Sequence, residues 1–215
     1  MSSSSQHATA KRALYIPGLG SNDQSRTGQL VKQYLEGRYE VLVKAWNLTS
    51  DPEQVLNDIS SYVRQSGTNM VIASSLGAFY ALGVLPGSVA KILINPCMRP
   101  SVEIPKLGNI SDRVVEQFKK LENLTYSNID AEVRIATFAG FGNDDELFNY
   151  QSEFGRLYGY FTEVQGRHHL PPSSLKQVVE YGLQHFDDIQ SRLKNEGLVA
   201  EQYTSCDLQA IQKNI

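Results

Sequence analysis

Three short segments of the sequence carry side chains that can perform chemistry together. They are Ser74-Ser75-Leu76-Gly77, Gly142-Asn143-Asp144-Asp145 and Gly166-Arg167-His168-His169. A serine hydroxyl is a weak nucleophile at neutral pH, so a histidine must take its proton during attack and return it to the leaving group. A carboxylate then orients the imidazole and stabilises its cation. In the order serine, acid, histidine, the sequence holds the three groups that an activated serine nucleophile requires.

Ser75 is favoured over Ser74 as the nucleophile for a steric reason. A nucleophile on a sharp strand-to-helix turn adopts strained backbone angles, and the residues two positions before and after it must be small. For Ser75 these residues are Ala73 and Gly77, whereas Ser74 has an isoleucine and a leucine at the same positions. The alternative is that the serine pair only caps the following helix.

The histidine that acts as the base is expected on the loop that begins at Gly166. The chain has four histidines, of which His7 lies in an N-terminal tail and His185 lies within the last predicted helix. Gly166-Arg167-His168 favours His168, and His169 remains a competitor because a shift of one residue in an irregular loop is invisible in the sequence. The alternative is a pair of histidines that face solvent.

The acid is expected just after Gly142, where Asp144, Asp145 and Glu146 compete. The spacing from Gly142 and the apolar residues that follow favour Asp145, while Asp144 could belong to an acidic helix start. Acyl transfer also needs two N–H donors for the oxyanion. We expect these from the backbone of Leu76, directly after the nucleophile, and of Leu19, in the loop after the first strand.

These segments must be positioned by an alternation of strands and helices. Apolar, β-rich runs predict strands over residues 12–17, 39–46, 69–73, 89–95, 132–139 and 158–164. Helical patterns predict helices over residues 25–36, from 51, over 78–85, 111–121 and 145–156, and from 171. This alternation predicts an α/β protein, a three-layer sandwich with a mostly parallel sheet. Ligand sites of such sheets lie at the carboxyl ends of strands, where all three segments are placed.

The segments together resemble the small YqiA-type serine esterases of the α/β-hydrolase superfamily. The resemblance rests on ALYIPGLGSN, IASSLGAFYAL, KILINPCMRP, GNDDELFNY and GRHHL, scattered between residues 13 and 183. It implies a minimal α/β-hydrolase fold in which Ser75, Asp145 and His168 form a catalytic triad. The sharp strand-to-helix turn that carries the nucleophile is called the elbow in this group. The Asn95-Pro96 and Arg99-Pro100 pairs match the motif that follows it.

Three positions depart from the pattern of this family. Pro17 stands where the family has a histidine, Ala73 replaces the first glycine of the elbow, and Ala78 replaces the glycine after it. Pro17 and Ala73 motivate an alternative function, a weak or inactive hydrolase-fold protein that binds a partner. A nucleotide-binding protein is favoured less, because the Gly18–Gly20 turn has neither a third glycine nor a P-loop lysine.

Composition excludes several other classes of protein. The 215 residues carry a net charge of −3 and two distant cysteines, which argues against a broad nucleic-acid surface and against a disulfide framework. No apolar run is long enough for a membrane span. The two distant cysteines favour a reducing, cytoplasmic compartment. The motifs and the family resemblance, in turn, imply an esterase of small acyl esters without metal or cofactor.

The domain organisation is expected to be one hydrolase domain over residues 12–195. It would be flanked by a disordered tail, residues 1–11, and by a segment without an assigned role, residues 196–215. The long connection over residues 97–130 is a candidate lid, where Met98, Ile104 and Leu107 could line an acyl pocket or simply pack in the core.

Overall fold

Strands and helices alternate along the chain, as the hydrophobic pattern predicts. The computed structural model describes residues 11–84 and 86–195. Its strands are β1 (Arg12–Ile16), β2 (Glu40–Val43), β3 (Met70–Ser74), β4 (Ala90–Ile94), β5 (Thr137–Gly142) and β6 (Phe161–Val164). Its helices are α1 (Arg26–Tyr34), α2 (Pro52–Ser66), α3 (Ser75–Gly83), α4 (Pro100–Leu107), α5 (Asp112–Ser127), α6 (Ala131–Ile135), α7 (Gln151–Leu157) and α8 (Pro172–Asn195). The predicted segment 196–215 and, apart from Lys11, the predicted tail 1–11 lie outside the described residues.

The six strands form one parallel sheet in the order β2-β1-β3-β4-β5-β6. The chain steps outward from β1 to β2 and then crosses back to β3 on the other side of β1. The strand order therefore reverses between β1 and β3, and a crevice for ligands opens at such a point. The predicted α/β class with a mostly parallel sheet is confirmed.

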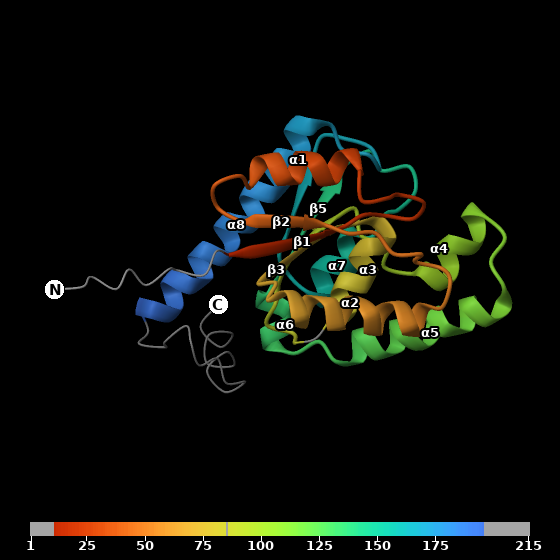
Figure 1. Cartoon of the computed structure of the whole chain (residues 1–215). Helices are drawn as coiled ribbons and strands as arrows, with labels where there is room; N and C mark the ends of the chain where they lie inside the picture. The colour runs from red at the N-terminus through yellow and green to blue at the C-terminus, as the bar shows by residue number, and fades with distance from the viewer. Residues whose placement is uncertain (1–10, 85, 196–215) are drawn as a thin grey trace.

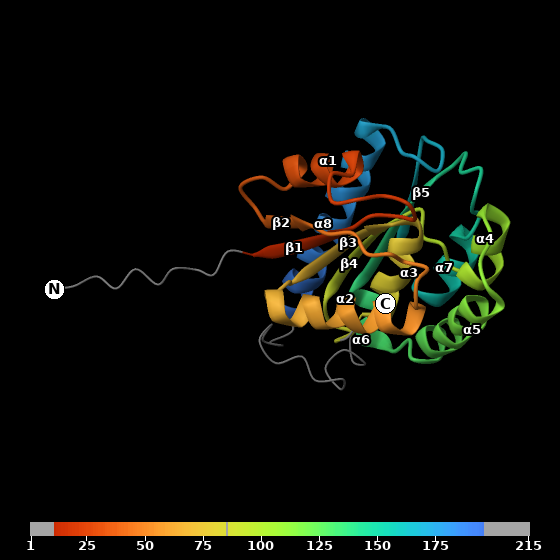
Figure 2. The ribbon, with the colours of Figure 1, turned by 45° about the vertical axis from the view of Figure 1, so that its right-hand side comes forward.

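Helices cover both faces of the sheet. One face carries α1 and α8, and the other carries α2, α3 and α5 with α7 beside them (Figure 1). The turned view shows α4 and α5 together at one side of the molecule (Figure 2). Each face has its own hydrophobic core. The strands contribute alternate side chains to the two cores, which explains why β3 reads as a continuous apolar run.

Local signals set the ends of the helices. The Asp51 side chain caps α2 by accepting from the Gln54 N–H at 3.2 Å, and Pro52 occupies the first turn. Gly67 ends the same helix in the left-handed conformation, with φ of 65°. No helix of residues 11–84 and 86–195 is long and apolar enough to cross a membrane.

Three predicted elements differ from the structure. The predicted strand 132–139 begins as helix α6, because Asp130 caps it by accepting from the Val133 N–H at 2.8 Å. The connection 97–130 contains two helices, where the sequence predicted one, since Pro105 inside α4 hides its helical pattern. The predicted helix 145–156 is helical only from Gln151, because the Asp145 side chain folds back onto the backbone of the next residues.

Close packing of α8 against β5 gives a first prediction. A Cβ added to Gly140 would lie 2.2 and 2.4 Å from the two methyl groups of Val178. Because valine is short and stiff, α8 itself would have to move. Gly140→Ala should therefore lower the free energy of unfolding by about 1–3 kcal/mol, measured by urea denaturation.

Gly108→Ala is the matched control for this substitution. No atom lies within 4 Å of a Cβ at that position, and its φ of 174° is extended backbone that any residue adopts. The control should unfold at the urea midpoint of the wild type. An unchanged midpoint for Gly140→Ala would contradict the packing described here.

Candidate active site

Ser75 lies at the junction of β3 and α3 with a backbone that side chains rarely adopt. Its φ is 54°, and Asn95 is the one other non-glycine residue with positive φ among the residues that the structure describes. Such a conformation costs about 1–3 kcal/mol and persists only where the surroundings enforce it. A Cβ on Gly77 would lie 2.4 Å from the Pro17 carbonyl oxygen. The turn therefore depends on a glycine at position 77.

Neighbouring loops hold Ser75 in place. The Cys97 N–H donates to the Ser75 carbonyl at 3.1 Å. The loop after β1 touches it as well, because a Cβ on Gly18 would lie 3.0 Å from the Ser75 Cβ. Leu19 follows in this loop and lines the same cavity as Ser75. Leu76 is in the first turn of α3, where backbone N–H groups have no acceptor within the helix.

The structure brings Ser75, Asp145 and His168 together from three loops. The His168 Nε2 lies 3.1 Å from the Ser75 Oγ. On the other side of the ring, Nδ1 lies 3.1 and 3.0 Å from the two carboxyl oxygens of Asp145. One imidazole thus connects the hydroxyl to the carboxyl group.

The Asp145 carboxyl group is held by the backbone of its own loop. Its Oδ1 accepts from the Leu147 N–H at 2.8 Å and from the Phe148 N–H at 3.1 Å. The side chain is 2% exposed. Hydrogen bonds to backbone groups leave little freedom to rotate, so Asp145 presents a fixed pair of oxygens to His168.

The loop around His168 is fixed by Phe148 and Glu146. The Phe148 ring meets the imidazole edge-on, with centroids 4.8 Å apart. The Glu146 carboxylate accepts from the His168 backbone N–H at 3.0 Å and pairs with Arg167. This backbone hydrogen bond is the main reason that the pKa of Glu146 is lowered. The sequence suggested Glu146 only as a candidate acid. In the structure its carboxylate instead supports the loop that carries His168.

The competing residues Asp144 and His169 lie differently. The Asp144 side chain accepts from Gln165 Nε2 at 3.1 Å, and its backbone N–H donates to the Gly166 carbonyl at 2.9 Å. The His169 ring is exposed, lines the cavity and lies 5.6 Å from the His168 ring, centroid to centroid. Asp144 therefore ties two loops together, and His169 stands beside the histidine that contacts Ser75.

Asn95 joins the loops that carry the acid and the histidine, a role that sequence reasoning missed. Its Nδ2 donates to the Arg167 carbonyl at 3.1 Å and to the His168 carbonyl at 2.8 Å. Its Oδ1 accepts from the Gly142 N–H at 2.7 Å. The side chain is buried. The only sequence signal was its place in the Asn95-Pro96 motif, which does not reveal these partners.

The cavity beside Ser75 has a volume of about 200 Å³. Its lining includes Leu19, Leu107 and Leu147, which are 40%, 50% and 40% exposed. Of the three residues expected either to line an acyl pocket or to pack in the core, Leu107 lines this cavity, whereas Met98 and Ile104 are buried in the core.

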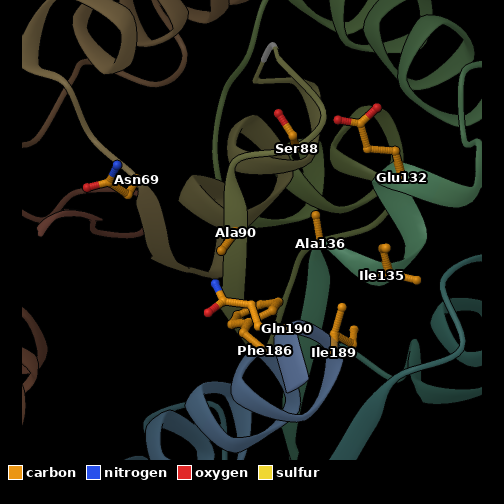
Figure 3. A pocket seen from close by; sticks show the side chains of 9 residues that line it. All are labelled: Asn69, Ser88, Ala90, Glu132, Ile135, Ala136, Phe186, Ile189 and Gln190. Carbon is orange, nitrogen blue, oxygen red and sulfur yellow. The ribbon is translucent and has the colours of Figure 1, made fainter. Parts of the chain in front are cut away.

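A second cavity of about 160 Å³ lies at the opposite end of the sheet (Figure 3). Phe186, Ile189 and Gln190 of α8 lie on one side of it, and Ser88 and Glu132 lie on the other. It borders the starts of strands, where parallel sheets seldom bind ligands. Its lining holds one carboxylate and no histidine or cysteine, so we place the candidate active site at Ser75.

Solved structures of several enzymes have a similar fold. Est1E from Butyrivibrio proteoclasticus superposes with a TM-score of 0.64 at 15% identity, over 84% of this chain and 90% of that one. The haloalkane dehalogenase DbeA from Bradyrhizobium elkani gives 0.51 at 9%, over 84% and 92%. YbtT, a type II thioesterase of yersiniabactin biosynthesis, gives 0.50 at 13%, over 85% and 95%. No protein-family model matches the sequence, and no curated protein matches it.

The fold is therefore that of the α/β-hydrolases, as the resemblance implied. At 9–15% identity the likeness establishes the fold, and what the chain does must be argued from its site.

The contacts of Asn95 give a second prediction. Asn95→Asp removes both donors and places a carboxylate beside two carbonyl oxygens inside the protein. The free energy of unfolding should fall by about 2–4 kcal/mol in urea denaturation, because buried acceptors lose their partners.

Asn128→Asp is the matched control. Asn128 is exposed and donates through Nδ2 to the Leu124 carbonyl at 2.8 Å, at the end of α5. Its substitution should cost under about 1 kcal/mol. Equal effects of the two substitutions would show that Asn95 does not hold the loops.

Proposed function

We propose that the protein is a serine hydrolase, specifically a carboxylic ester hydrolase. Ser75 is the proposed nucleophile, His168 the base and Asp145 the group that orients the base. The observation that carries this proposal is the single imidazole that lies 3.1 Å from the Ser75 Oγ and 3.0 Å from the Asp145 Oδ2. These distances are within the reach that proton transfer requires. The partners assign the tautomer, with Nδ1–H donating to Asp145 and Nε2 accepting from Ser75.

The reaction begins when the Ser75 Oγ attacks the acyl carbonyl carbon. The new C–Oγ bond forms as the Ser75 proton passes to His168 Nε2, and the carbonyl oxygen becomes an oxyanion. The imidazolium is stabilised by the Asp145 carboxylate. The intermediate collapses when the bond to the leaving alcohol breaks and the alcohol oxygen takes the proton from Nε2. The acyl group is left on Ser75 as an ester.

Water completes the cycle by the same route. It attacks the acyl carbon as His168 takes one of its protons, and that proton returns to Ser75 when the C–Oγ bond breaks. The N–H groups of Leu19 and Leu76 are the proposed oxyanion donors, each contributing about 3 kcal/mol to the transition state.

The cavity favours a small acyl group. At about 200 Å³ with three exposed leucines beside it, it suits a short apolar chain rather than a long lipid. Est1E has been crystallised with ferulic acid, in a structure with a TM-score of 0.58. YbtT is a thioesterase, so a thioester is the second chemistry to test.

Replacement of the nucleophile gives a third prediction. Ser75→Ala should lower kcat for p-nitrophenyl butyrate about a millionfold, because the residual rate then comes from binding and the oxyanion donors alone. His168→Ala should lose as much, and Asp145→Asn about ten-thousandfold, because the tautomer of His168 changes. Initial rates measured at saturating ester test all three.

Asp144→Asn is the matched control for the acid, since Asp144 points to Gln165 rather than to His168. Its kcat should equal that of the wild type. His169→Ala should lose far less than His168→Ala. A fluorophosphonate probe should label the wild type at Ser75. A folded protein that neither reacts with the probe nor turns over ester would support the alternative, a hydrolase-fold protein that binds a partner.

A further inference from the structure

The cavity lining carries hydroxyl groups that acyl transfer does not use. Besides Ser75, the cavity is lined by Tyr15, Ser21, Ser25, Thr27 and Ser74. They come from β1, the loop after it, the start of α1 and the end of β3. We call these five residues the hydroxyl wall.

The hydroxyl wall is organised around a buried phenol. The Tyr15 OH and the Ser74 Oγ lie 2.9 Å apart. Burial raises the pKa of Tyr15, against the effect of the hydroxyls of Ser74, Ser25 and Thr27 beside it. The phenol therefore stays neutral. Each hydroxyl can donate one hydrogen bond and accept others, so the wall offers both donors and acceptors at fixed places.

Other residues that line the cavity are apolar. Leu19, Leu107 and Leu147 come from the loop after β1, the end of α4 and the loop after β5. All three are substantially exposed. The leucines and the hydroxyl groups thus suit different halves of an ester, an apolar half and a half that bears hydroxyl groups.

The position of His168 decides which half is which. It must return its proton to the leaving oxygen, so the alcohol half lies beside it. The next residues, His169 and Leu170, line an open groove of about 580 Å³. Ser21, Ser25 and Thr27 belong to both the groove and the cavity. The alcohol therefore leaves along the hydroxyl wall, and the acyl group lies against the leucines.

The groove carries little charge. Its remaining lining consists of Asn22, Arg26, Leu30, Pro171 and Pro172. Among all these residues there is no carboxylate, and Arg26 is the only permanent cation. Resting on the proposed function, we propose that the hydroxyl wall binds the alcohol part of the ester and that this alcohol is a neutral polyhydroxylated molecule, of the sugar or glycerol kind.

The test compares esters that share one acyl group. Propyl butyrate and glyceryl monobutyrate differ only in the hydroxyl groups of the alcohol, and methyl 6-O-butyryl-glucoside carries its hydroxyl groups on a sugar ring. We expect kcat/KM for the glyceryl ester and for the glucoside ester to exceed that for propyl butyrate at least about tenfold, because hydroxyls built to bind a polar substrate are left unpaired by the apolar one.

Two substitutions locate the preference. Thr27→Val keeps the shape and removes the hydroxyl, and Ser21→Ala removes a hydroxyl from an exposed position. Each should lower the ratio of kcat/KM values, glucoside ester over propyl ester, about fivefold, as one neutral hydrogen bond allows. Thr162→Val on β6 is the matched control and should keep the wild-type ratio, because Thr162 does not line the cavity or the groove.

The outcomes separate the two proposals. Two results would overturn the proposal that the hydroxyl wall binds the alcohol while leaving the proposed hydrolase function intact. One is hydrolysis of propyl butyrate without preference for the hydroxylated esters. The other is a ratio of kcat/KM values that is unchanged in both Thr27→Val and Ser21→Ala. If butyryl-CoA is turned over ten times faster than the glucoside ester, the proposal of a neutral polyhydroxylated alcohol is overturned. If no ester is hydrolysed, the proposed function fails. Binding to the hydroxyl wall is then tested by saturation-transfer NMR of methyl glucoside with the Ser75→Ala protein. A saturation-transfer signal that is lost when Thr27→Val is added supports binding of the alcohol at the wall. The absence of any signal with Ser75→Ala overturns it.

Discussion

The side-chain amide of Asn95 is the interaction on which the geometry of the site depends. Parallel strands end at one edge of the sheet, but their loops would otherwise vary independently. One buried side chain on β4's loop binds the carbonyls of Arg167 and His168 and the N–H of Gly142. It thereby fixes the two loops that carry Asp145 and His168. The proposed proton transfer tolerates little misplacement, so the mechanism proposed above depends on this buried amide.

Ser75, the proposed nucleophile, is positioned by a different means, close backbone packing. α3 approaches the loop after β1 so nearly that Gly77 has no room for a Cβ. The same approach brings Gly18 against Ser75 and keeps the strained φ of 54°. The cost of that strain is offset by the burial of α3, whose residues from Leu76 to Leu82 are all buried. Core packing thus maintains an unfavourable turn that exposes one hydroxyl.

Local sequence patterns made the sheet and the elbow predictable, whereas contacts between distant segments could not be predicted from them. Ala73 and Gly77 specify the elbow within five residues, and apolar strand runs specify the sheet. The partners of Asn95 lie 47 and 73 residues away, so no local pattern reveals them. The segment 132–139 fits strand and helix periods alike, and the cap by Asp130 decides its first half. His168 and His169 differ by one residue, and only the fold of their loop distinguishes them.

The segment between β4 and α6 brings Leu107 to the cavity beside Ser75. α4 is fastened by the hydrogen bond of 2.7 Å from the Tyr150 OH to Glu103 and by the ion pair of Arg99 with Glu153. α5 is joined to it through the buried Glu122, which accepts from the Ser101 N–H at 2.7 Å. These contacts set Leu107 at the rim of the cavity, half exposed. In the proposed ester hydrolase, selection among esters would therefore fall to the groups that touch the alcohol, the hydroxyls beside α1.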